Sequence, residues 1–188
     1  MKRGIKLLLW CVAWLNLALG MLGPIYAIFV ESVGGDILDV SWAYFAFAAT
    51  TALTIYVMGH IEDKIKKKEN LITLGYIIAS LGIFSYLFVH NQFTLIATQI
   101  ILGLSIAILS PVFDSVYSLY TSKEKSASEW GNLEAIGYLV PAIAALIGGY
   151  IVKIFGFRVL FITMFIISLM SVIASTHLFK GKRYLNKE

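Results

Sequence analysis

The chain is organised around one charged stretch, GHIEDKIKKK at residues 59–68. The stretch begins with a glycine, places Asp63 four residues later and then adds a cluster of lysines. It is the only strongly charged run between the N-terminus and the C-terminal tail, and long apolar segments lie on both sides of it. Taken alone, such a run is typical of a basic loop between two membrane-spanning helices.

Composition predicts an all-α integral membrane protein. Of the 188 residues, 59% are hydrophobic, and the mean hydropathy is +0.83. A soluble domain of this size cannot bury so many apolar side chains. Because one spanning helix takes about 20 residues, the chain has room for roughly six spans with short loops and no soluble domain.

Apolar runs separated by polar connections predict six spans in one transmembrane domain, residues 1–188. They cover roughly residues 6–30, 38–58, 71–89, 93–119, 130–152 and 159–179. Pro24 falls inside the first span, where we expect it to kink the helix or mark its outer turn. A cleavable signal peptide is the alternative for the N-terminus, since basic residues precede the apolar run and Ala18-Leu19-Gly20 could serve as a cleavage site. The apolar run continues past Gly20, which favours a span.

Lysines and arginines predict the orientation. With six spans, both termini lie on one side of the membrane, and thirteen of the fifteen basic residues lie on that side. They are Lys2, Arg3, Lys6, Lys64, Lys66, Lys67, Lys68, Lys123, Lys125, Lys180, Lys182, Arg183 and Lys187. The positive-inside rule then places both termini in the cytoplasm of a multi-pass cell-membrane protein. The net charge of +4 therefore indicates topology and not nucleic-acid binding.

The charged stretch resembles a loop of the major facilitator superfamily of transporters. Between their second and third helices, these proteins carry roughly Gly-x-Leu-x-Asp-Arg-x-Gly-Arg-Lys. The matching positions are Gly59, Ile61, Asp63, Lys64, Lys67 and Lys68. Lys66 stands where the family usually has glycine, and Glu62 where it usually has a small residue.

Other stretches resemble the family in the same chain order. The fourth span keeps the frame of the family's Arg-x-x-x-Gly, with Gln99 in place of the arginine and Gly103 at its end. The fifth span is rich in glycine and proline, but its spacing departs from the antiporter form, so we do not infer antiport. The remaining matches are Gly20-Met21-Leu22-Gly23-Pro24, Gly34-Gly35, Ser110-Pro111 and Gly156-Phe157-Arg158.

The resemblance implies half of a major-facilitator fold. The family has twelve spans in two six-helix halves, each built from two three-helix repeats, and this chain resembles the N-terminal half. A lone half would expose to lipid a face that normally meets the other half, which is costly for polar groups. A parallel homodimer about an axis along the membrane normal would cover that face. A fragment of a full-length transporter and a heteromeric partner are the alternatives.

Polar and small residues inside the spans are the candidates for a site. By resemblance, the first and fourth helices line the substrate cavity. The candidates for the cavity or for coupling are Asn16, Thr50, Gln99, Ser105 and Asp114. Small residues at helical spacing more often mean close packing, which we predict for Gly103, Gly137, Pro141 and Gly148. Since no lysine or arginine lies at the centre of a span, a neutral, weakly polar or cationic substrate is favoured.

Asp114 and Glu134 lie near the inner ends of the fourth and fifth spans, and three readings stay open for them. They could couple transport to protons, form gate pairs with Lys123, Lys125 or the Lys64–Lys68 cluster, or act as passive interfacial anchors. The predicted inner-loop motif and gate comprise Gly59, Asp63, Lys64, Lys67, Lys68 and Glu134. By resemblance, Asp63 would hold the fifth span of a second copy near Trp130, at a helix N-terminus.

These patterns predict a half-sized secondary-active transporter of a small solute, acting as a homodimer by alternating access. A non-transporting scaffold, sensor or accessory subunit with the same fold is the alternative. The sequence contains no Gly-x-Ser-x-Gly, His-Glu-x-x-His, P-loop or cysteine metal set, so an enzyme is disfavoured and no cofactor or metal is predicted. The expected partners are an unidentified solute, the lipid bilayer and a second copy. The one cysteine, Cys11, excludes an intramolecular disulfide.

Overall fold

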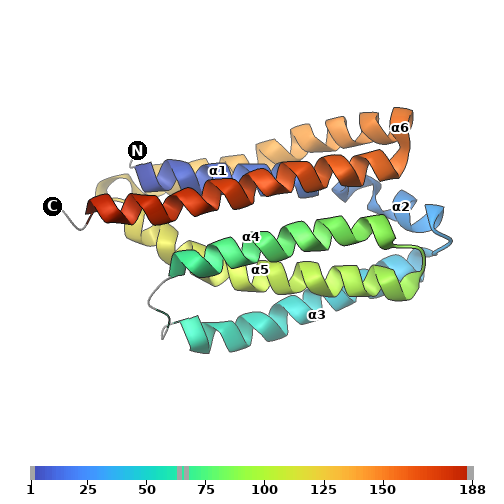
Figure 1. Ribbon diagram of the computed structural model, residues 1–188, viewed down its shortest axis with the longest axis horizontal. Coiled ribbons are helices and arrows are strands. Elements are labelled where there is room, and N and C mark those ends of the chain that lie inside the picture. Colours follow the sequence, from blue (N-terminus) through green and yellow to red (C-terminus); the bar gives the residue numbers. More distant parts are fainter. Residues whose placement is uncertain (1–2, 63–64, 66–67, 186–188) are drawn as a thin grey trace.

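The computed structural model describes residues 3–62, 65 and 68–185, and within these ranges all regular structure is helical (Figure 1). Long helices dominate, and three short 3-10 turns connect or extend them. The elements are α1 (Arg3–Gly20), η1 (Gly23–Ile25), α2 (Tyr26–Ser32), α3 (Ile37–Glu62), α4 (Lys68–Ser85), η2 (Tyr86–Phe88), α5 (Gln92–Tyr120), η3 (Lys123–Lys125) and α6 (Ser126–Leu185).

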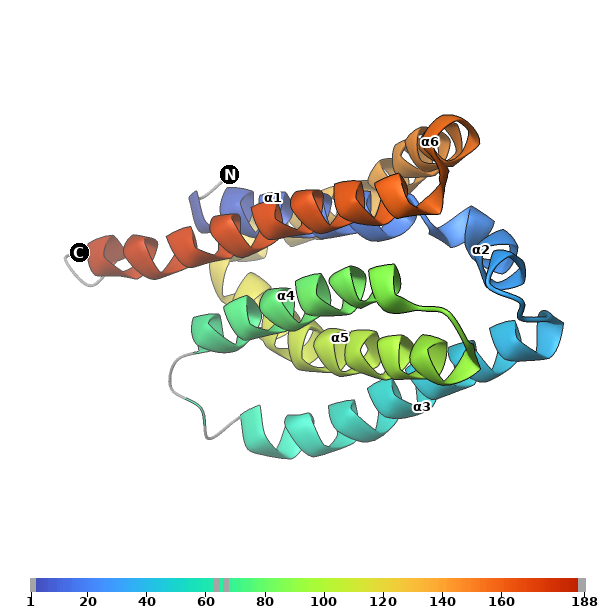
Figure 2. The same cartoon turned by 45° about the vertical axis from the view of Figure 1, so that its right-hand side comes forward.

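Five helical segments of the described chain are long and apolar enough to cross a membrane. They are Gly4–Ser32, Ile37–Ile61, Lys68–Phe88, Gln92–Tyr120 and Lys123–His177. The last has 55 residues, more than twice what one crossing takes. Gly156 breaks it, with φ 80° and ψ 174°, a backbone conformation open to glycine and strained for other residues. Figures 1 and 2 show α6 doubling back, so we distinguish a first arm, residues 126–155, and a second arm, residues 157–185.

The first apolar segment is interrupted near its outer end. α1 stops at Gly20, and Pro24 lies in the 3-10 turn η1 before the chain resumes as α2. Proline has no backbone N–H and cannot continue the hydrogen-bond ladder of a helix, which explains the interruption. The turn is held by a hydrogen bond from the backbone N–H of Ile25 to the carbonyl of Leu22, 3.0 Å long.

The start of α5 is fixed by a capping box. The side chain of Asn91 accepts a hydrogen bond of 2.9 Å from the backbone N–H of Thr94. In return, the Thr94 hydroxyl accepts a hydrogen bond of 3.2 Å from the backbone N–H of Asn91. This reciprocal pair satisfies two backbone groups at the helix end and separates α4 from α5 with a short turn.

The helices form two packed groups. α3 packs on α5, α1 packs on α6, and α4 joins the groups by contacting both α5 and α6 (Figure 2). α1 has few contacts with α5. The first residues of α1 and the last residues of α6 lie at the same end of the molecule (Figure 1). The seam between α1 and α5 is therefore the loosest contact between the two groups.

Glycines bring α1 and the first arm of α6 into backbone contact. A Cβ added to Gly148 would collide with the backbone of Met21. A Cβ added to Gly20 would lie 2.7 Å from the Cα atom of Pro141. Gly148, Pro141 and Gly20 thus permit an approach that larger residues would prevent.

Gly137 differs from the packing role that the sequence suggested, since a Cβ there would meet nothing within 4 Å. The reason is that the two helices separate on the inner side of Pro141. A groove of about 360 Å³ lies between them there, lined by Ile136 of α6 and by Lys6, Leu9, Trp10 and Ala13 of α1. Small size at Gly137 is not used for contact within one copy.

α3 is the least covered of the long helices. It packs on α5 and leaves large apolar side chains exposed along its length, such as Leu53 at 70% and Tyr56 at 72%. The first arm of α6 does the same with Tyr138 at 77% and Leu146 at 79%. α4 and the second arm also expose apolar side chains, such as Leu81 at 54% and Ile166 at 58%, so lipid or a partner can cover several faces of the bundle.

We expect Gly148→Ala to destabilise the protein by about 1–3 kcal/mol, because the added methyl group overpacks the contact with Met21. The matched control is Gly149→Ala, since a Cβ at Gly149 meets nothing within 4 Å. That variant should be neutral or gain up to about 1 kcal/mol from helix propensity. Thermal unfolding of both purified variants, followed by circular dichroism, checks this. Equal melting temperatures for the two would contradict the packing argument.

Candidate functional site

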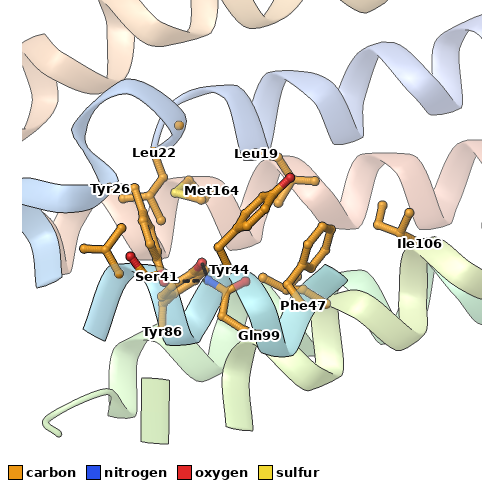
Figure 3. A pocket seen from close by; sticks show the side chains of 13 residues that line it. Leu19, Leu22, Tyr26, Ser41, Tyr44, Phe47, Tyr86, Gln99, Ile106 and Met164 are labelled. Carbon is orange, nitrogen blue, oxygen red and sulfur yellow. Dashed lines mark hydrogen bonds between the residues drawn. The ribbon is translucent and has the colours of Figure 1, made fainter. Parts of the chain in front are cut away.

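A cavity of about 640 Å³ lies between the two helix groups, toward the end of the bundle that carries η1, α2 and η2. Its walls come from α1, η1, α2, α3, η2, α5 and the second arm of α6. The lining residues are Leu19, Leu22, Gly23, Tyr26, Val40, Ser41, Tyr44, Phe47, Tyr86, Gln99, Leu102, Ile106 and Met164 (Figure 3). Its volume falls in the usual range for small-molecule sites.

Gln99 is the polar centre of this cavity. Its side-chain nitrogen donates hydrogen bonds to the hydroxyl oxygens of Tyr26, at 2.8 Å, and Tyr86, at 3.0 Å. The amide is buried, with 8% of the residue exposed, and Figure 3 shows its nitrogen turned toward the two tyrosines. Both of its N–H groups are used, so the orientation of the amide is fixed.

An aromatic cluster holds Tyr86 in place. Its ring stacks on Phe161 at a centroid distance of 5.1 Å and meets the edge of Phe29 at 5.7 Å. Phe29 also contacts Phe157 at 5.3 Å and Phe161 at 4.8 Å. Because Phe157 follows the break at Gly156, the cluster ties the turn of α6 to the cavity wall. Such contacts add specific geometry to apolar burial.

A second, smaller cavity brings together two of the candidates from the sequence. It has a volume of about 180 Å³ and lies between α1 and α5, with Asn16 on one wall and Asp114 on the other. Ile106 lines both cavities, so the two are neighbours along the seam between α1 and α5. Asn16 is half-buried and Asp114 is exposed. The seam therefore carries an amide at its middle and a carboxylate toward its inner end.

Thr50 and Ser105 lie outside both cavities. Thr50 sits in the seam between α3 and α5, where its Cβ would be 3.2 Å from a Cβ added to Gly103. The same glycine lies against the backbone carbonyl of Phe47. Ser105 is fully buried, and its hydroxyl donates to the carbonyl of Leu102 at 2.7 Å in its own helix. The structure thus uses this region for helix contact.

The inner-loop candidates are only partly described. Asp63, Lys64 and Lys67 lie outside the described residues. Gly59 is exposed with open space around it. The ammonium group of Lys68 donates a hydrogen bond of 2.7 Å to the hydroxyl of Ser115, which joins the start of α4 to the inner half of α5. Glu134 is exposed on the first arm of α6.

Glu129 is a buried carboxylate that the sequence reasoning did not assign to the site. It is 5% exposed and accepts a hydrogen bond of 3.0 Å from the backbone N–H of Ser122. Its backbone carbonyl accepts a hydrogen bond from the hydroxyl of Tyr117. These bonds close the inner turn between α5 and α6. The sequence signal was Ser126 followed three residues later by a glutamate, the pattern of a helix start.

Tyr86 was missed for a different reason. It lies in the 3-10 turn η2 after α4, and it reaches the cavity only because α4 and α5 pack side by side. No spacing within either helix points to its contact with Gln99.

The fold and the cavity agree with the family comparison. The model of the Major Facilitator Superfamily matches residues 8–187, so the chain belongs to this family of membrane transporters. The family and its relatives point to a membrane transport protein and not to an enzyme.

Two curated relatives and one solved structure are similar to the chain. The quinolone resistance protein NorA of Staphylococcus aureus is 24% identical over 154 residues, which are 82% of this chain and 39% of the relative. The uncharacterized MFS-type transporter MJ1560 of Methanocaldococcus jannaschii is 23% identical over 77% of this chain and 37% of its own length. The chain therefore spans about two fifths of these relatives. The crystal structure of the POT family transporter PepTSo has the same fold, with a TM-score of 0.78 and 16% identity over 97% of this chain and 38% of that one.

Glu129 and Glu134 offer a matched pair of carboxylates on one helix. We expect Glu129→Ala to destabilise the protein by about 1–2 kcal/mol, because it leaves the backbone N–H of Ser122 without its acceptor. Glu134→Ala should stay within about 0.5 kcal/mol of the wild type, since its side chain is exposed. Denaturant titration of the purified variants measures both. An equal loss of stability in the two variants would contradict the assignment of Glu129 to the inner turn.

Proposed function

We propose that this protein is a half-sized secondary-active transporter of a small solute, which works as a homodimer by alternating access. Membership of a transporter family supports transport across a membrane. The observation that carries the proposal is the cavity between the two helix groups, large enough for a small organic molecule and centred on Gln99. One relative is named a quinolone resistance protein, and a small organic solute for this chain is consistent with that name.

In this proposal the chain crosses the membrane six times. The two arms of α6 are separate spans joined at Gly156, since 30 residues in the first arm already exceed what one crossing takes. Both termini then lie in the cytoplasm of the cell because the lysines and arginines are concentrated on that side.

Two strongly exposed apolar faces support the homodimer in this proposal. α3 and the first arm of α6 lie on opposite groups of the bundle, and both present large apolar side chains outward. About two fifths of the length of the relatives is present here, so a second copy could take the place of the remaining helices. A two-fold axis along the membrane normal would set α3 of one copy against the first arm of α6 of the other.

Alternating access would use the seam between α1 and α5. α1 and α5 make few contacts with each other, so in this proposal the seam between them would open while α4 keeps the two groups joined. Asp114 and the bond between Lys68 and Ser115 lie toward the inner end, where a gate would open and close. The predicted role of Asp63, in the inner loop, is part of the same gate.

A non-transporting scaffold, sensor or accessory subunit is the second candidate, and a fragment of a full-length transporter is the third. Nothing in the geometry of the cavity favours either over transport. Reciprocal movement at the two ends of the cavity distinguishes the first candidate from a static scaffold.

We expect a crosslink between copies when one carries Tyr56→Cys and the other Tyr138→Cys, both in a Cys11→Ser background. Both positions are strongly exposed, at 72% and 77%, and α3 and α6 do not pack on each other within one copy. The measurement is the mass of the protein in nanodiscs, followed by crosslinking of differently tagged copies. The control pair replaces Tyr56 by cysteine in both copies. A monomeric mass would overturn the homodimer.

Alternating access predicts opposite changes at the two ends of the cavity. Single cysteines at Tyr44 and at Asp114 probe the larger and the smaller cavity. When a crosslink between the two copies holds their inner ends together, maleimide labelling at position 114 should fall several-fold. Labelling at position 44 should rise. Labelling of vesicles of both orientations would also report the side on which position 114 opens. Labelling that stays constant at both positions would favour the scaffold.

A further inference from the structure

We propose that the larger cavity selects neutral aromatic solutes that carry a carbonyl group. The inference names the substrate class of the proposed transport function and therefore rests on it for its physiological meaning. Binding itself can be measured without transport, so the two ideas can fail separately.

The hydrogen bonds of Gln99 determine which polar groups remain for a ligand. Its nitrogen donates to both tyrosine hydroxyl oxygens, and nitrogen in an amide does not accept. The O–H hydrogens of Tyr26 and Tyr86 are therefore directed away from the amide. Within the described residues, neither hydroxyl donates to a protein acceptor. Two donors thus remain beside Gln99, and the carbonyl oxygen of a ligand can accept from one or both of them.

The oxygen of Gln99 adds an acceptor beside the two donors. No described residue donates a hydrogen bond to it, and Figure 3 shows it on the side of the amide away from the two tyrosine hydroxyls. A ligand N–H or O–H next to the carbonyl would be satisfied there. The cavity therefore offers a donor, donor and acceptor set, and a ligand without polar groups would leave this set unpaired.

The rest of the lining favours a flat ring. Tyr44 and Phe47 of α3 present aromatic rings to the cavity, and Leu19, Leu102 and Met164 close it with apolar contacts. Tyr44 is 69% exposed, so its ring stands at the open side of the cavity. Aromatic rings stack on such walls in offset or edge-to-face geometry.

The charge of the ligand is limited by the same lining. None of the thirteen described lining residues is an aspartate, glutamate, lysine, arginine or histidine. Moving a charged ligand from water into this cavity is costly, because no lining side chain carries the opposite charge. Asp114 lies in the neighbouring cavity, on the other side of Ile106. A cation must reach that second cavity before it meets a carboxylate.

Four naphthalene derivatives of similar shape test the inference as probes. 1-Acetylnaphthalene carries the carbonyl, 1-ethylnaphthalene lacks it, 1-naphthoate is an anion and 1-naphthylmethylammonium is a cation. Binding to the full-length protein in nanodiscs is measured by calorimetry, with empty nanodiscs subtracted. We expect the acetyl compound to bind about tenfold more tightly than each of the other three, the preference of a site built to hydrogen-bond its ligand. Equal affinity for the ethyl compound would overturn the hydrogen-bonding role, and tighter binding of either ion would overturn the preference for neutral ligands.

Variants assign the preference to the cavity. Gln99→Leu removes the amide that holds the two hydroxyls, and Tyr26→Phe removes one donor. In Gln99→Leu, we expect the preference for the acetyl over the ethyl compound to fall to about twofold or less. In Tyr26→Phe, we expect it to shrink several-fold. The control is Tyr138→Phe, which removes a hydroxyl on the outer face of α6 and should change nothing. A preference that survives both cavity variants would place binding elsewhere.

The result separates this inference from the transport proposal. A carbonyl preference without opposite labelling changes at positions 44 and 114 would support the binding site and overturn transport. Opposite labelling changes without a carbonyl preference would support transport and overturn the substrate class.

Discussion

The contact of Gly148 with the backbone of Met21 is the constraint on which the rest of the bundle depends. In a membrane, apolar side chains gain little by leaving lipid for one another, so helices are held by close packing and by polar contacts. Gly148, Gly20 and Pro141 supply the close packing and fix α1 to the first arm of α6. Because α1 is attached there, its contact with α5 stays loose. The cavity is the space that this division leaves.

The polar centre of the cavity is built so that the protein does not satisfy it completely. Gln99 uses its two N–H groups on tyrosines that come from different elements, α2 and η2. Tyr86 is held by an aromatic cluster that includes Phe161 of the second arm of α6. In the proposed binding site, the hydroxyls would therefore be positioned before a ligand arrives, and its binding would need little ordering. Burial of such a set in an apolar lining gives selectivity because an unmatched ligand leaves it unpaired.

The sequence predicts the class of fold well because hydropathy is a local property. Composition predicts the membrane-spanning helices, the resemblance of several motifs predicts the family, and helical spacing points to Gln99 and Gly148 as residues that face other helices. The sequence cannot rank Glu129 against Glu134, since burial of Glu129 depends on a turn that folds back onto it. It also cannot find Tyr86, whose contact with Gln99 depends on two helices lying side by side.

The prediction that Gly137 packs closely against another helix is wrong for a related reason. Small size permits close contact between helices but does not require it, and the neighbouring helix must also be there. Between α1 and α6, a groove lies on the N-terminal side of Pro141, beside Ile136. The close contacts of Gly20 and Gly148 lie away from this groove.

The contact between α3 and α5 has a mechanical consequence. α3 is held on one side only, and its closest backbone approach is at Gly103, opposite Phe47 near the middle of the helix. Thr51 strengthens this point, since its hydroxyl lies 3.3 Å from the carbonyl of Gly103. A larger residue at position 103 would push this part of α3 away from α5. Tyr44 and Phe47 of the same helix line the larger cavity, so such a shift at Gly103 would also move one wall of that cavity.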